Sequence, residues 1–436
     1  MAISSFTGLQ TSLRALMAQQ AALDTTAHNI ANINTVGYTR QTTELSAALP
    51  YTLPAGITQT GSGAQIGAGV DVLAFKRARE VFGDLQYRAQ QMLGGQASTQ
   101  AQALDQAQDL AGEPSDTGIN HLLSKYYDAW QDVADHPEST SAKAALVGHA
   151  KSLATAINQL DKGLAQIQTT AAGAYAQQTG AAGPVQTAAT EIAALNGGIK
   201  DALARGQSPN DLLDRRDLLL DQLSALGQLS TTDLGGGAIS VQFGDAAAPL
   251  VNDTTVTWPQ TLTAATGGKL GALIDLGSPT GTIGAYRADL DAVASSLATT
   301  TNAIHPTAFF SGTTAASLTV VATSATVAAG STAAAGANDL ALSLAALRGG
   351  GTDTTYAGLI QNMGAGAADA QRRADTAKSL SASADQRRQS VSGVSLDEEL
   401  TDMLKFQRGY QAASRALSTM DEMLDVLINR TGRVGL

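Results

Sequence analysis

Side chains suited to catalysis or metal binding are few in this sequence, and their spacing matches no known site. The five histidines neither form an H-E-x-x-H pair nor lie at another metal-binding spacing; they are His28, His121, His136, His149 and His305. The sequence has no cysteine, which excludes disulfides, thiolate zinc sites and thiol nucleophiles. We therefore predict no catalytic residue, no cofactor and no metal, and we expect that the protein is not an enzyme.

Two clusters of charged side chains could be mistaken for catalytic sites. The first consists of three consecutive acids that open a helical pattern near the C-terminus, Asp397, Glu398 and Glu399. Negative charge at a helix start is stabilised by the helix dipole, so we predict a capping role for them. The second cluster mixes both signs and is expected to form ion pairs on a solvated helix face; it comprises Asp214, Arg215, Arg216 and Asp217.

Three aromatic residues at helical spacing, Tyr126, Tyr127 and Trp130, could line a ligand pocket. Large aromatic side chains at this spacing more often pack in a hydrophobic core. We therefore predict that these three side chains are buried in the core.

The overall composition limits the partners of the chain. Its net charge is −11, and phosphate binding needs a basic face, so we expect no nucleic acid partner. The same charge argues against binding to anionic membrane surfaces. Aromatic residues make up 4% and charged residues 15% of the chain, while small residues are abundant. This composition suits close packing of long helices in an elongated molecule.

The two ends of the chain carry the strongest pattern, because each is a long amphipathic stripe with steps of three and four residues. The N-terminal stripe contains Leu9, Leu13, Leu16, Leu23 and Ile30. The C-terminal stripe contains Leu396, Leu400, Met403, Tyr410, Leu417, Leu424 and Ile428. The two stripes could form a hairpin within one chain or a seam between chains. Polar interruptions at Gln20, Gln407, Ser414 and Asp421 weaken a self-sufficient hairpin, so we favour assembly between chains.

Between these ends the pattern is mostly helical. We expect helices over about 4–31, 77–111, 116–136, 141–205, 208–226, 283–303, 339–347 and 356–391, and one that opens at 395. Alternating residues predict strands at 69–73, 238–243 and 254–258. The prediction is a mainly α, elongated, multi-domain rod with a smaller β-rich domain, in which the terminal helices pair as a coiled-coil-like terminal domain.

We divide the predicted rod into three domains. A terminal helical domain comprises 1–40 and 396–436, and a helical rod domain comprises 41–230, 281–305 and 339–395. A small β-rich outer domain comprises 231–280 and 306–338. The sequence shows no cleavable signal peptide and no run of about 18 apolar residues that could span a membrane. It could therefore be cytosolic, or exported by a route that needs no cleaved signal.

Several segments resemble bacterial flagellar axial proteins. ANINTVGYTRQ (31–41) is similar to the N-terminal signature shared by rod, hook and hook-associated proteins, whose Asn and Gly residues, here Asn32 and Gly37 beside Tyr38, turn the chain out of the first helix. The blocks at 67–90, 208–230, 269–276, 283–305 and 389–430 more specifically resemble the hook-associated protein 1 family. The last block contains FQRGYQAA, which includes Phe406. In that family a large variable domain usually follows a segment like Phe309-Phe310, whereas here about thirty low-complexity residues fill the gap.

The resemblance implies a structural subunit at the junction between hook and filament. It implies self-assembly in a ring or helical array, contacts with the hook protein and with the adjacent hook-associated protein, and an export chaperone on the C-terminal helix. It also implies an extracellular location reached through the flagellar type III pathway. Another axial protein or a secreted coiled-coil adhesin remains an alternative, while an embedded enzyme would have no room after Phe310.

Overall fold

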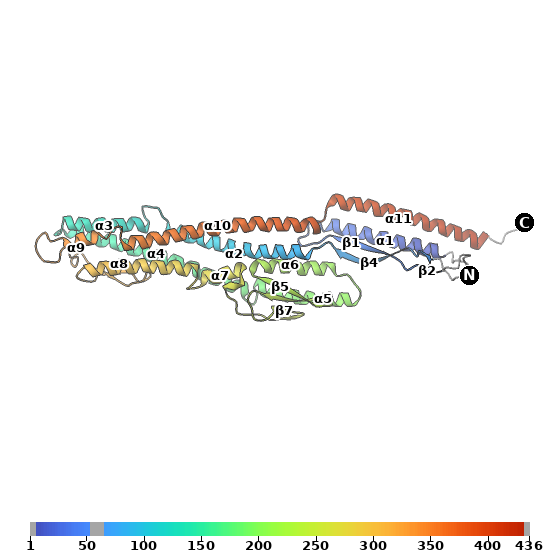
Figure 1. Cartoon of the computed structure of the whole chain (residues 1–436), viewed down its shortest axis with the longest axis horizontal. Helices are drawn as coiled ribbons and strands as arrows, with labels where there is room; N and C mark the ends of the chain where they lie inside the picture. The colour runs from blue at the N-terminus through green and yellow to red at the C-terminus, as the bar shows by residue number, and fades with distance from the viewer. Residues whose placement is uncertain (1–5, 53–64, 431–436) are drawn as a thin grey trace, which may run out of the picture.

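The computed structural model describes residues 6–52 and 65–430, so parts of the predicted terminal and rod domains lie outside it. The described chain forms a long rod, and its first and last helices lie together at one end (Figure 1). Helix accounts for 66% of the structure and strand for 10%. The predicted fold class, an elongated and mainly α molecule, is confirmed. No helix in the described part is long and apolar enough to cross a membrane.

The terminal helix pair consists of α1 (Phe6–Ala31) and α11 (Leu396–Asp425), which is continued by a short π-helical turn (Val426–Arg430). The two helices are antiparallel and keep one register along their length, because the same spacing separates successive contacts on both. Gly8 lies against Met420, Gln19 against Gly409, and Asn29 against Glu399. Glycine at positions 8 and 409 lets the helices approach closely, since an added Cβ there would collide with the facing side chain. Coiled-coil packing of this pair stays a prediction.

A β-hairpin also belongs to this end of the molecule. Strands β1 (Gln41–Ala47) and β4 (Val70–Arg77) pair antiparallel and pack along α1, and β2 (Tyr51–Thr52) pairs with β3 (Gln65–Ile66). Figure 1 shows the hairpin beside α1. Residues 41–47 and 70–77, which the sequence assigns to the rod domain, thus contact the terminal helix, and the domain boundary at residue 41 stays a prediction.

The rod is built from long helices that run side by side. Helix α2 (Val81–Ala111) packs along α10 (Gly351–Ser392), and the far end contains α3 (Ile119–Asp135), α4 (Thr140–Thr179), α8 (Thr282–Ile304) and α9 (Asp339–Ala345). Their facing residues form a continuous core of aliphatic side chains. Tyr126, Tyr127 and Trp130 are buried in it, as predicted. The ring of Tyr126 contacts those of Tyr127, Phe309 and Phe310, and Trp130 contacts Phe309.

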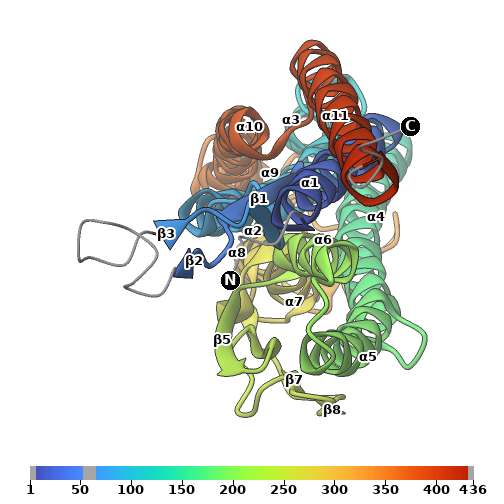
Figure 2. The same ribbon diagram turned by 90° about the vertical axis from the view of Figure 1, so that its right-hand side faces the viewer.

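A side projection lies between the two ends. It contains α5 (Pro184–Ala204), α6 (Asn210–Leu226), a 3-10 turn (Ala264–Thr266), α7 (Gly268–Gly277) and a four-stranded sheet in the order β5 (Leu229–Gly235), β6 (Ala238–Phe243), β7 (Val251–Asn252), β8 (Thr255–Val256). Viewed along the rod, α5 and this sheet lie on the side opposite to α11 (Figure 2). Strands β9 (Phe310–Ser311) and β10 (Thr319–Val320) form a separate sheet against α8 and α4. The strands of 231–280 and of 306–338 thus belong to two separate sheets, and their grouping in one β-rich outer domain stays a prediction.

The far end contains a buried histidine whose charge state affects folding. His305 Nδ1 lies 2.6 Å from the carbonyl oxygen of Thr307, and its Nε2 accepts a hydrogen bond from the amide of Ala328 at 3.0 Å. This pattern requires a neutral ring, and burial lowers the pKa of His305 below its ordinary value of about 6.5.

We therefore expect the stability of the far end to fall as pH drops from 7 through 6.5 toward 5. In that range the unfolded chain takes up a proton at His305 that the folded chain does not, so stability is lost until the folded pKa is reached. Thermal unfolding at pH 7 and pH 5 measures the effect. The difference in melting temperature between pH 7 and pH 5 should be smaller for His305→Gln than for wild type, whether or not the variant is equally stable. An equal difference would contradict this role for His305.

Candidate functional site

The C-terminal stripe splits into two rows with different surroundings. Met403, Tyr410, Leu417 and Leu424 are half-buried against α1, together with the row that begins at Glu399 and continues through Phe406, Ala413 and Met420. Leu396, Leu400 and Ile428 are 46%, 45% and 66% exposed. The pairing of α11 with α1 therefore leaves these three predicted interface residues exposed. On the inner face, Met403, Tyr410 and Leu417 are each followed three residues later by another half-buried residue. Gln407 and Asp421 come four residues after Met403 and Leu417, and both are exposed.

The N-terminal stripe divides in the same way. Leu9, Leu16, Leu23 and Ile30 are half-buried, whereas Leu13 is 39% and Phe6 is 54% exposed. Gln20 belongs to this exposed row. The fully buried side of α1 consists of small or polar residues that lie between α11 and the β-hairpin, namely Ser12, Ala18, Ala22, Thr25, Thr26 and Asn29. Leu13 thus belongs to the exposed row of α1 and not to the half-buried row.

Exposed apolar side chains are concentrated near this end. Of the 28 large apolar residues that are exposed in the described chain, 20 lie in residues 6–85 and 391–428, and only eight lie in the longer intervening segment. The most exposed are Leu49 at 89%, Val36 at 79%, Val81 at 74% and Phe82 at 71%. Exposed apolar side chains gathered in one region of a soluble protein mark an interaction site. We name these 20 residues the terminal apolar surface.

A buried polar contact fixes the start of α11 to the end of α1. Glu399 is 1% exposed and accepts hydrogen bonds from Arg40 Nε at 2.6 Å and from Asn29 Nδ2 at 3.0 Å. The Asn29 amide is fully used, because its oxygen accepts from Tyr38 Oη and from the Gln41 amide. Glu399 therefore holds three chain segments together, which is a role that the sequence did not predict.

The turn that follows α1 holds three of the predicted interface residues. Asn32 Nδ2 donates to the His28 carbonyl at 3.0 Å and so satisfies the end of the helix. Tyr38 is half-buried, and its hydroxyl donates to Asn29 Oδ1 at 2.7 Å. Gly37 has a positive φ of 83° and lies against the side chain of Leu218 on α6. All three thus make contacts within the chain.

Gly37 should not tolerate a side chain. A Cβ on this residue would lie 3.1 Å from Leu218 Cβ, and the left-handed backbone costs a non-glycine residue about 1–2 kcal/mol. We expect Gly37→Ala to lower the free energy of unfolding by at least about 1 kcal/mol. Chemical denaturation measures it, with Gly206→Ala as the control for a positive φ in open space. Equal losses in both variants would show that contact with Leu218 adds nothing.

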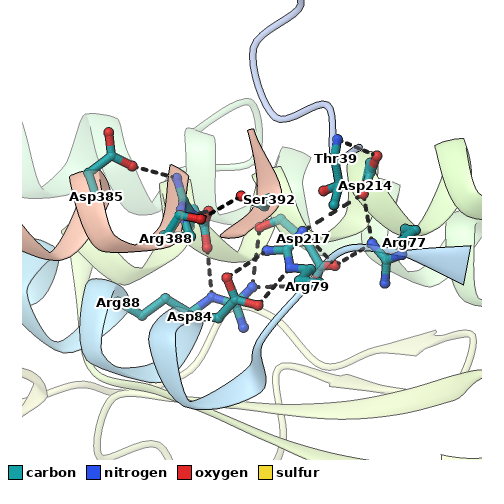
Figure 3. A network of polar contacts seen from close by, with 11 residues as sticks. Thr39, Arg77, Arg79, Asp84, Arg88, Asp214, Asp217, Asp385, Arg388 and Ser392 are labelled. Atoms are coloured by element: carbon teal, nitrogen blue, oxygen red, sulfur yellow. Dashed lines mark hydrogen bonds and ion pairs between the residues drawn. The ribbon is translucent and has the colours of Figure 1, made fainter. Parts of the chain in front are cut away.

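A network of arginines and aspartates joins the terminal end to the rod (Figure 3). Helix α6 presents three carboxylates on one face, from Asp214, Asp217 and Asp221. They meet arginines from three other segments: Arg77 and Arg79 at the end of β4, Arg88 on α2, and Arg388 on α10. The amide of Thr39 also donates to Asp214 Oδ2 at 2.9 Å. We name these residues the junction network.

The prediction that residues 214–217 form a solvated charged face is wrong, because two of them are buried. Asp214 and Arg216 are 5% and 8% exposed. Burial alone would raise the pKa of Asp217, but the guanidinium groups of Arg79 and Arg77 outweigh it and hold the pKa below its usual value. Arg388 also stacks over the ring of Tyr87 at 3.8 Å. This part of α6 is a structural clamp on the ends of β4 and α10.

The described residues include no group of His, Asp or Glu side chains that could hold a metal ion. The recognisable features of this end are an exposed apolar surface, a helix pair and a polar clamp beneath it. Such an arrangement suits a subunit that binds other subunits through its ends.

Comparison with known proteins identifies the class. The family model for the flagellar hook-associated protein FlgK helical domain matches residues 104–264. Models for the flagella basal body rod protein and for the C-terminal part of the basal body rod FlgEFG proteins match 9–39 and 385–430. The terminal segments are thus of a type shared by flagellar axial proteins, while the middle of the chain carries the more specific match, as predicted.

Individual relatives agree. Flagellar hook-associated protein 1 of Bacillus subtilis is 31% identical over an alignment of 505 residues, which covers 98% of this chain and 99% of that protein. The Salmonella typhimurium protein of the same name is 30% identical, over 52% of this chain and 39% of that protein. The flagellar hook junction protein FlgK of Burkholderia pseudomallei has a TM-score of 0.45 and 25% identity, over 51% of this chain and 43% of that one.

The chain is therefore a flagellar structural protein, and it belongs to the flagellar hook-associated protein 1 family. The members of this family are non-enzymatic components of the hook–filament junction. The enzyme and adhesin alternatives are set aside by this membership.

Proposed function

We propose that the chain is a junction subunit that assembles through its terminal region, in contact with the hook protein on one side and the adjacent hook-associated protein on the other. The observation that carries this proposal is the concentration of 20 of 28 exposed large apolar side chains in the described chain near the terminal end. A folded monomer gains nothing from exposing them, whereas burying one leucine side chain contributes roughly 1.5–3 kcal/mol. Contacts between neighbouring copies would cover this surface.

The predicted interface residues take two roles in this proposal. Those on the inner rows hold the helix pair together within a subunit: Leu9, Leu16, Leu23, Ile30, Met403, Phe406, Tyr410, Leu417 and Leu424. Those on the outer rows would pack against neighbouring subunits: Leu13, Leu396, Leu400 and Ile428. Asn32, Gly37 and Tyr38 shape the turn that carries the exposed Val36. The junction network would transmit load from this interface to the rod.

The route to the assembly site is also a proposal. We infer that the chain is exported through the flagellar type III pathway without a cleaved signal and acts outside the cell. An export chaperone would cover the C-terminal helix beforehand, because the outer row of α11 is exposed in the monomer and would otherwise associate prematurely. The acidic net charge of −11 gives no basis for binding nucleic acid.

The position of the subunit can be tested with a single label, because the chain has no natural cysteine. Ser343→Cys places one thiol on exposed α9, far from the terminal end (Figure 1). The variant is expressed in its own bacterium after deletion of the chromosomal copy, and flagella are labelled with a thiol-reactive dye. One spot at the boundary between hook and filament is expected. Label spread along the filament, or none on flagella that have filaments, would overturn the proposal.

A further inference from the structure

An apolar groove runs between α2 and α10, away from the junction network. Its volume is about 500 Å³, and its apolar lining includes Leu93, Ala97, Ala377 and Leu380. Leu93 and Leu380 are 44% and 49% exposed, although they lie between two packed helices. Two arginines line the same groove, and no acidic residue does. The groove therefore has an apolar floor and a positively charged edge.

The charged edge is available for a partner. The side chains of Arg372 and Arg373 are 71% and 69% exposed, and both lie beside a single carboxylate, that of Asp369. One carboxylate cannot neutralise two guanidinium groups. Ion pairs this exposed contribute at most about 1 kcal/mol, so exchanging Asp369 for an incoming acid costs little.

We propose that this groove binds the C-terminal end of α11 from a second copy of the chain. The inference rests on the proposed function, because it names the neighbour contact that a terminal helix makes in the assembly. A short amphipathic helix lying in a hydrophobic groove is a common mode of recognition.

The end of α11 has the complementary chemistry. Met423 and Val426 are 56% and 47% exposed and lie one turn apart on the side that faces away from α1. Asp421, Glu422 and Asp425 flank them, and residues 416–429 contain no lysine or arginine. Apolar side chains would enter the groove while these acids pair with Arg372 and Arg373. The exposed row of α1 is a poorer fit, because Leu13 and Met17 are accompanied by Arg14.

The contact is possible between two copies whose rods point in the same direction. Helices α10 and α11 follow one another along the rod (Figure 1). At about 1.5 Å per residue, the distance along the two helices from Ala377 to Val426 is roughly 70 Å. A second copy displaced by that distance along the rod axis would place its α11 end at the groove. Because the contact is head-to-tail, it repeats from copy to copy and suits an open helical or tubular array.

Engineered cysteines test the contact directly, since no natural cysteine interferes. The full-length variant Leu380→Cys/Met423→Cys is incorporated into flagella, which are isolated and oxidised. A ladder of covalent oligomers is expected, whereas Leu342→Cys/Met423→Cys should give none, because Leu342 has similar exposure on the distant α9. If the Leu380→Cys/Met423→Cys variant is incorporated but forms no ladder, the proposed groove contact is wrong.

Charge reversal provides a second, independent test. Arg372→Glu/Arg373→Glu should reduce incorporation at least tenfold, and so should Glu422→Arg/Asp425→Arg, while the combination of all four should restore it. Arg387→Glu, an exposed site on α10 outside the groove, should leave incorporation unchanged. Normal incorporation of either double variant, or failure of the combination to recover, would overturn the proposal.

The two proposals fail in different ways in these experiments. If wild-type protein is found at the junction but forms no groove contact, only the groove proposal is lost. If wild-type protein is absent from the junction, the proposed function itself is wrong. Thermal unfolding of each purified variant verifies that the rod remains folded.

Discussion

Glu399→Ala is expected to release α11 from α1 and to abolish assembly. The mutation removes the carboxylate that accepts from both Arg40 Nε and Asn29 Nδ2, although Arg40 keeps its pairs with Glu398 and Asp402 and Asn29 keeps the Gln41 carbonyl. A hydrogen bond to a charged group contributes about 1.5–3 kcal/mol, and the mutation removes two of them. The helix pair has few fully buried apolar residues to offset such a loss. Amide hydrogen exchange in α11 and over much of α1, which is already faster than in α3 and α4 in the wild-type monomer, should become faster still, while α3 and α4 stay as protected as in wild type.

The neighbouring acid provides a matched control for this mutation. Glu398 also binds Arg40, at 2.9 Å, but its side chain is 63% exposed. An exposed ion pair contributes about 0–1 kcal/mol, so Glu398→Ala should leave exchange and assembly nearly unchanged. If both variants behaved alike, burial of Glu399 would not be the cause, and the anchoring role of this contact would be wrong.

Leu13→Asp and Leu400→Asp are each expected to abolish incorporation without unfolding the monomer. Both side chains belong to the terminal apolar surface, at 39% and 45% exposure, so an aspartate there remains solvated in the free subunit. In an assembled interface the same carboxylate would be buried without a partner, which costs several kcal/mol and is repeated at every subunit. Thermal unfolding of the purified variants should match wild type, while labelled flagella should lack the chain.

A surface leucine outside this region tests whether the effect is specific. Leu342 on α9 is 44% exposed, nearly the same as Leu400, but lies at the far end of the rod. Leu342→Asp should therefore be incorporated normally. If Leu400→Asp and wild type entered flagella equally well, the outer row of α11 could not be an interface.

Helix positions and the general shape could be predicted from the sequence, because apolar periodicity over long segments is a strong signal. The assignment of faces was less successful. The predicted seam combined the inner row of α11 with the row through Leu400, Gln407 and Asp421, which is exposed. The polar residues at 407 and 421, interpreted as interruptions of a buried seam, instead mark a row that faces away from α1. Glycine at 409, opposite Gln19, also reveals the true contact face.

Polar anchors could not be found by periodicity. Glu399 lies among three acids that favour a helix start, and nothing nearby in sequence shows that Arg40 will reach it. Likewise, Asp214 and Asp217 have arginine neighbours on their own helix, yet their partners come from β4, far away along the chain. Long-range pairing of this kind depends on how the segments pack. For the same reason, the sequence could not show that the strands near 310 and 320 form a sheet separate from the one near 240.

Amide hydrogen exchange on the purified full-length chain, together with its mass by light scattering, would show whether the terminal helices are reserved for assembly. We expect a monomer in which α1 and α11 exchange much faster than α3, α4 and α8, because the terminal helices lack the neighbours that cover their outer rows. Protected terminal helices in a small, stable oligomer would contradict it. Such a result would mean that the ends satisfy one another in solution and are not reserved for assembly in the flagellum.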